Sequence, residues 1–64
     1  MYKVIIDKIN FKKQFNSFYG ALAFVKALKL HYENLIEKID YRDERRLFFI
    51  DLYWNIKIEK VLEK

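Results

Sequence analysis

The sequence contains no cysteine, no proline and a single glycine among its 64 residues. Without cysteine there are no disulfides and no thiolate ligands for zinc. One histidine is too few for an imidazole metal site, and one glycine is too few for a glycine-rich phosphate loop. Ser17 is the only aliphatic hydroxyl, so no nucleophile and base can be paired. We therefore expect a protein that is not an enzyme and that uses no catalytic residue, metal or cofactor.

Long hydrophobic runs are missing as well, and we expect no signal peptide. No apolar run approaches the roughly 18 residues that a membrane span needs. Charges interrupt the apolar stretch at the N-terminus, which argues against a signal peptide. Together with the absence of cysteine, these features favour a cytoplasmic location and no membrane partner.

Aromatic residues and positive charge are what the chain has in quantity. Aromatic residues make up 19% of the sequence, and the formal net charge is +4. A chain of this length forms one small domain, residues 1–64, whose stability margin is thin unless its core is dense or completed by association. The charge permits contact with nucleic acid or acidic proteins without requiring either.

Residue usage also indicates a source. Lysine, isoleucine, phenylalanine, tyrosine and asparagine fill 33 of the 64 positions. Their codons are rich in A and T, which indicates an AT-rich genome. Very short chains of this kind are common in phages and mobile elements, so we expect such an origin, with a bacterial host cell as the place of action.

The N-terminal segment has the period of a β-strand. Over residues 2–7 the pattern places Tyr2, Val4 and Ile6 on one face, so that face of the predicted strand is apolar. The phase slips at Asp7, which indicates a bulge or a turn into a second short strand that ends near Phe15.

A helical period follows, and it predicts a helix over residues 17–32, capped by Asn16 or Ser17. Its apolar stripe comprises Phe18, Ala21, Leu22, Val25, Leu28 and Tyr32. The next segment, residues 34–41, fits either a strand or an extension of that helix to about residue 40. We favour the strand, because the polar residues 41–46 can close a hairpin onto the segment that follows.

Residues 46–59 carry the most regular alternation in the chain. Every even position from 48 to 58 is apolar: Phe48, Ile50, Leu52, Trp54, Ile56 and Ile58. This pattern predicts a long strand with Trp54 buried on its core face. The predicted fold is α+β, a small antiparallel sheet of three to four strands with one helix packed on one face, in the order β(β)αββ.

The opposite face of that strand supplies the predicted partner-binding residues, which are Arg45, Arg46, Phe49, Tyr53 and Lys57. Apolar surface in excess of one small core is typical of an interface. We expect a small non-enzymatic binding protein that sterically inhibits a host defence protein, in the manner of anti-CRISPR proteins. The alternative is a small nucleic-acid-binding protein, since aromatic residues between cations on a sheet can stack bases and hold phosphates.

Self-association is a further hypothesis. Residues 54–59 would extend past their hairpin partner as an unpaired, apolar strand edge, and such edges tend to be paired, here through residues 54–60. A stripe of the helix, which comprises Gly20, Ala23, Phe24 and Ala27, offers a second contact surface. A homodimer would use one of these surfaces or both.

Overall fold

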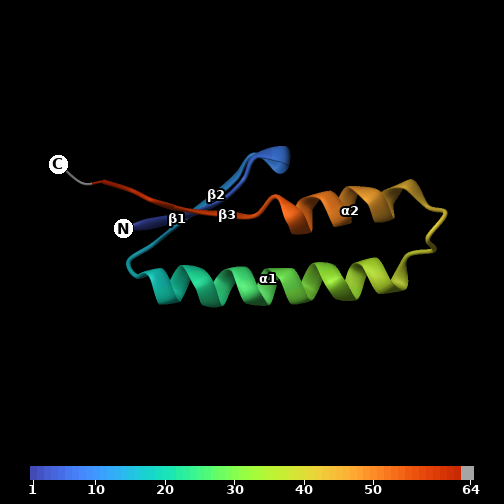
Figure 1. The fold of residues 1–64 in the computed structure, drawn as a ribbon, viewed down its shortest axis with the longest axis horizontal. Coiled ribbons are helices and arrows are strands. Elements are labelled where there is room, and N and C mark those ends of the chain that lie inside the picture. Colours follow the sequence, from blue (N-terminus) through green and yellow to red (C-terminus); the bar gives the residue numbers. More distant parts are fainter. Residues whose placement is uncertain (63–64) are drawn as a thin grey trace.

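The computed structural model describes residues 1–62. The elements in chain order are β1 (Tyr2–Ile6), the 3₁₀ turn η1 (Asp7–Ile9), β2 (Phe11–Phe15), α1 (Phe18–Lys38), α2 (Glu44–Trp54) and β3 (Lys57–Lys60). The three strands form an antiparallel sheet in the order β2-β1-β3. The helix α1 runs along the length of an elongated molecule. The sheet covers the first half of α1 and α2 covers its second half (Figure 1).

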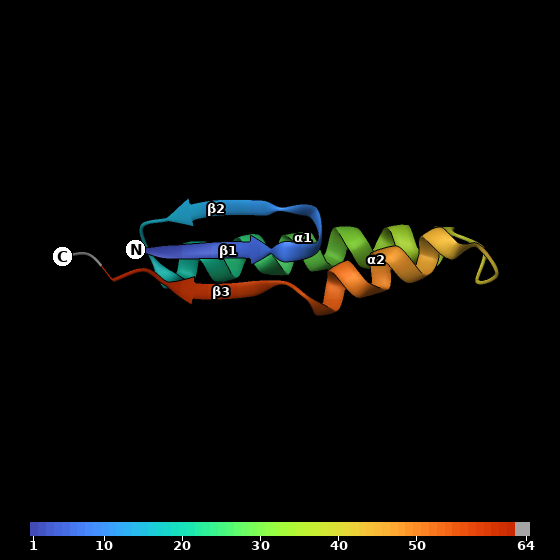
Figure 2. The same ribbon diagram turned by 90° about the horizontal axis from the view of Figure 1, so that it is seen from above.

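The prediction of an α+β fold with a small antiparallel sheet is confirmed. The prediction of a single helix is wrong, and so is the order β(β)αββ, because two helices lie between β2 and β3. Seen from above, β1 is the central strand and α2 continues beyond the end of the sheet on the β3 side (Figure 2).

The β1–β2 hairpin accounts for the slip in phase at Asp7. A 3₁₀ turn follows Ile6, and Asn10 closes it with a positive φ of 53°. Asparagine is one of the few residues that adopts this left-handed conformation readily. The strands then pair from Ile6 opposite Phe11 to Tyr2 opposite Phe15.

Ser17, one of the two residues predicted as a cap, is the N-cap of α1. Its hydroxyl oxygen accepts a hydrogen bond from the backbone N–H of Gly20 at 3.0 Å, which satisfies one of the free donors of the first turn. A Cβ on Gly20 would lie 3.2 Å from that same oxygen, so the only glycine of the chain leaves room for the cap.

The helix runs on to Lys38, so the predicted strand over residues 34–41 is wrong and its rival, the helix extension, is what the structure contains. Tyr32, Leu35 and Ile36 continue the helical stripe, and α2 is there to receive it. Tyr32 and Leu35 belong to a core cluster with α2 residues.

Two core clusters lie along α1. The first joins Val4 of β1 to Ala21 and Val25, and the second joins Ile6 to Tyr32 and Leu52. Val4 and Ile6 are fully buried. Burial also raises the pKa of the Tyr32 phenol above its ordinary value. The apolar face of β1 therefore links both halves of the molecule.

The predicted strand over residues 46–59 is wrong. Asp43 caps a helix in its place: its carboxylate accepts the backbone N–H of Arg45 at 3.0 Å. The helix α2 ends at Trp54, and only Lys57–Lys60 form a strand, which pairs with β1. A helix satisfies its own backbone groups, and Leu52 and Phe49 can reach α1 from one face of it.

The burial predicted for Trp54 is also wrong, because its side chain is 74% exposed. It lies on the side of α2 opposite Leu52, which is 2% exposed and points into the core. Residues 52 and 54 share a face in a strand, but they point to nearly opposite sides of a helix.

Candidate functional site

An exposed apolar stripe on α2 is the most distinctive surface of the molecule. It consists of Leu47 and Trp54, which are exposed, and Ile50, which is half-buried between them, and we call it the α2 stripe. The spacing of three, then four residues places them on one side of the helix. Leu47 is 66% exposed and Trp54 74% exposed. Large apolar side chains grouped in this way on a small protein are typical of a binding surface.

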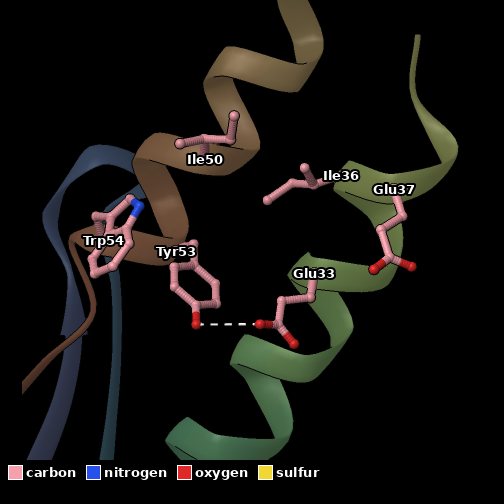
Figure 3. Close-up of a pocket in the computed structure, with 6 residues that line it drawn as sticks. All are labelled: Glu33, Ile36, Glu37, Ile50, Tyr53 and Trp54. Carbon is pink, nitrogen blue, oxygen red and sulfur yellow. Dashed lines mark hydrogen bonds between the residues drawn. The ribbon is translucent and has the colours of Figure 1, made fainter. Parts of the chain in front are cut away.

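A groove of about 370 Å³ between α1 and α2 adjoins the stripe. It is lined by Glu33, Ile36, Glu37, Ile50, Tyr53 and Trp54. Figure 3 shows the Ile36 side chain pointing from α1 across the groove toward α2, with Trp54 at the end near the strands. The groove walls are therefore mainly apolar, and the two carboxylates lie on the α1 side.

Tyr53 connects the two helices at the floor of this groove. Its hydroxyl donates a hydrogen bond to Oε1 of Glu33 at 3.4 Å (Figure 3). The ammonium of Lys29 lies 5.1 Å from the centre of the Tyr53 ring, within the range of a cation–π contact. These contacts fix the Tyr53 ring and place one cation beside the acidic rim of the groove.

The predicted partner-binding residues divide between packing positions and separate surfaces. Phe49 packs in the core cluster of Tyr32, with ring centres 6.1 Å apart. Tyr53 is half-buried and lines the groove. The strand face on which their grouping was based does not exist, since both lie on α2 and face α1. Of the predicted residues, only Tyr53 belongs to the groove.

Arg45 lies at the start of α2. Its guanidinium contacts the Asp43 carboxylate at 2.7 Å. Hydrogen bonds from the Arg45 side chain, and to a smaller extent from its backbone N–H, hold the pKa of Asp43 below its ordinary value. The pKa of Arg45 is raised by the same pair. Arg45 therefore binds the residue that caps α2. Its guanidinium is exposed, so its role in partner binding stays a prediction.

Arg46 and Lys57 lie on different elements. Arg46 is half-buried in the first turn of α2. Lys57 lies on β3, where its ammonium donates to the Asp7 carboxylate at 3.0 Å, and this bond raises the pKa of Lys57. Their role in partner binding stays a prediction.

The sheet face turned away from α1 carries the other notable charge pattern. Val4 packs against α1, so by alternation its odd-numbered neighbours and the residues opposite them lie on the outer face. These residues are Lys3, Ile5, Lys12, Gln14, Lys57 and Glu59. This face is basic but has no aromatic residue among them, so it can contact phosphate without stacking on bases.

Comparisons with protein-family models, curated proteins and solved structures found no match to the chain. Across residues 1–62, no three histidine or carboxylate side chains are placed to hold a metal ion. Neither helix in this described region has both the length and the apolar character that a membrane crossing requires.

Sequence reasoning missed Trp54 and Ile36 as residues of this surface. The signal that could have found them is the cap at Asp43 followed by apolar residues at helical spacing. Read from Asp43, positions 49, 52 and 53 form one side of a helix and positions 47, 50 and 54 form another.

Proposed function

We propose that this protein is a small, non-enzymatic binding protein that covers a surface of a partner protein through the α2 stripe and the adjoining groove. The observation that carries the proposal is the exposure of Trp54, 74%, on a helix whose opposite side is packed. Tryptophan is among the residues that most often dominate the energy of an interface.

The stripe is held ready for binding by the rest of the fold. Leu52 and Phe49 anchor α2 to α1, so the outward side chains are presented on a fixed helix. Binding would then cost less conformational entropy than if the α2 segment had to fold first. The groove adds an apolar recess with a carboxylate rim, which matches the usual pattern of an apolar centre and a polar edge.

Size supports a steric mechanism. A typical interface buries about 800 Å² on each partner. The accessible surface of the described chain is 5147 Å², and the molecule is 48 Å long, so one long side can supply such an area. Binding alone would block whatever acts at the covered surface.

Residue usage supports the biological setting. The protein would come from an AT-rich phage or mobile element. In the host cytoplasm it would inhibit a host defence protein, in the manner of anti-CRISPR proteins. Turnover is not part of this mechanism, and neither is a cofactor.

Phage restriction tests this role directly. Bacterial strains that each carry one defence system would express the protein, and the plating efficiency of a restricted phage would be measured. We expect recovery in one strain, loss of recovery with Trp54→Asp or Leu47→Asp, and no loss with Tyr19→Asp. Tyr19 is a matched control because it is 81% exposed and lies at the far end of α1.

Recovery in no strain would contradict the anti-defence role. Equal recovery with the stripe variants would contradict the stripe as the binding surface. With the target protein identified from the responsive strain, a purified pair would give the affinity. This affinity should change little with salt, because the stripe is apolar.

The basic outer face of the sheet supports a second function, nucleic-acid binding. Lys3, Lys12 and Lys57 can contact phosphates on an open surface. Binding of this kind would weaken steeply with salt. Fluorescence anisotropy with labelled single-stranded DNA separates the two functions, since Lys3→Glu with Lys12→Glu should abolish such binding and Trp54→Asp should not.

A further inference from the structure

The strand β3 has an open edge. In the part of the chain that the structure describes, β3 pairs with β1 on one side and with no strand on the other (Figure 2). An open edge presents unpaired backbone N–H and C=O groups, which another strand can pair with. The residues of β3 indicate which strand fits this edge.

The direction of the backbone N–H and C=O groups of β3 limits the registers in which a second strand can pair with its open edge. The N–H of Val61 donates to the C=O of Met1, and Met1 lies opposite Val61 in the register of β1 and β3. Hydrogen-bonded and non-hydrogen-bonded positions alternate in an antiparallel pair. The odd-numbered residues of β3 therefore bond to β1, and Ile58 and Lys60 direct their backbone groups to the open edge.

Only registers that pair even-numbered residues of β3 with even-numbered residues of a second copy are compatible with these groups. If Lys57 opposed itself or Glu59 opposed itself, like charges would meet, which is unfavourable. If Ile58 opposes Ile58 of the second copy, Lys57 faces Glu59 and Glu59 faces Lys57. This register is the one that pairs opposite charges at both places.

We propose that two copies of this chain associate through β3, antiparallel and with Ile58 on the two-fold axis, to form a continuous six-stranded sheet. Such an isologous contact closes on itself and yields a dimer. On the outer face, Lys3 lies opposite Glu59 of its own sheet, and Glu59 would lie opposite Lys57 of the second copy. Charges would therefore alternate across the junction.

The other open edge does not offer this match. The strand β2, Phe11–Phe15, has two lysines and no acidic residue, so no register of β2 with itself pairs opposite charges. Lysine on an edge strand is a common protection against pairing. The assembly therefore stops at two copies, and the inference is independent of the function proposed for the α2 stripe.

Charge exchange tests the register. Lys57→Glu and Glu59→Lys should each bring like charges together twice and shift the protein to a monomer. The double exchange, Lys57→Glu with Glu59→Lys, should restore the dimer. Sedimentation velocity up to millimolar concentration measures this, with circular dichroism to show that each variant is folded. Monomeric wild-type protein throughout this range would overturn the proposal, as would a double exchange that fails to restore the dimer.

Intramolecular pairs require a control. Lys57 also bonds Asp7, and Glu59 also faces Lys3, so each single variant disturbs its own subunit. Asp7→Asn removes the first pair without changing the edge and should leave the dimer intact. The double exchange retains both intramolecular losses, so restoration must come from the contact between copies.

Disulfide trapping reads the register independently, because the chain has no cysteine of its own. Lys57→Cys protein is mixed with isotope-labelled Glu59→Cys protein in a glutathione buffer. Residues 57 and 59 would form a non-hydrogen-bonded pair, with Cα atoms about 4.5 Å apart, which suits a disulfide. We expect the mixed disulfide to dominate by mass spectrometry and Gln14→Cys to give only the background. Dominant self-disulfides of either protein, or none above that background, would overturn the register.

Discussion

Trp54 and Leu52 provide the sharpest test of the fold, because they lie two residues apart on α2 and only Leu52 is buried. Leu52 is 2% exposed in the core cluster with Ile6 and Tyr32, and Trp54 is 74% exposed. Leu52→Ala should lower the free energy of unfolding by about 2–5 kcal/mol, as other buried leucines do. Trp54→Ala should lower the free energy of unfolding by less, although tryptophan is the larger residue.

The cost of Trp54→Ala follows from its contacts. A fully buried tryptophan covers about 150–250 Å², so the buried quarter of Trp54 covers roughly 50 Å² and contributes about 1 kcal/mol. The edge-to-face contact with Tyr53, ring centres 5.1 Å apart, adds an amount of similar size. We therefore expect a loss of about 1–2 kcal/mol in total.

Urea unfolding monitored by far-UV circular dichroism measures both variants, and this signal does not depend on tryptophan. With a slope of about 1–3 kcal/mol per molar urea, Leu52→Ala should shift the midpoint well beyond the shift of Trp54→Ala. If Trp54→Ala were the more destabilising of the two, the helical placement of residues 44–54 would be refuted.

Further predictions test other parts of the structure. Circular dichroism should show roughly half of the chain as helix, because α1 and α2 have 21 and 11 residues; a quarter would contradict α2 and the end of α1. Fluorescence of Trp54 should be water-like in the monomer, and blue-shifted emission would contradict its exposure. Ser17→Ala should cost about 1 kcal/mol in urea unfolding, through loss of the cap. The lowered pKa of Asp43 stabilises the fold above the ordinary carboxyl value of 3.8 and this contribution is lost as pH falls below it, so Asp43→Asn should reduce the loss of stability in acid. An unchanged acid loss in that variant would remove this role.

The N-terminal half of the fold was predictable because its periods are local and unambiguous. Alternation over residues 2–7 matches β1, and the helical stripe matches the buried residues Ala21, Val25 and Tyr32. The cap at Ser17 fixes where the period changes. In this half the core-facing apolar residues of β1 and α1 each recur with one period, so only one period fits the pattern.

Residues 34–41 were not predictable in the same way. Leu35 and Ile39 fit both a strand and a helix, and the choice depended on the partner. A strand there needed a long strand over residues 46–59 to pair with. Since residues 44–54 form a helix instead, Leu35 packs against that helix and α1 continues. One wrong partner therefore produced two wrong elements, because tertiary contacts decide ambiguous segments.

The error at residues 46–59 has a physical cause that concerns function. A helix with one apolar side cannot alternate, because residues two apart lie about 200° apart around its axis. Leu52 faces the core, Phe48 one turn earlier is 40% exposed, and positions 50 and 54 lie on the stripe side. Perfect alternation arose because both sides are apolar. Stability requires only the side that meets α1, so the second apolar side has to be explained by something other than folding. The α2 stripe is that second side, and the failure of the strand prediction therefore marks the surface that we propose binds a partner.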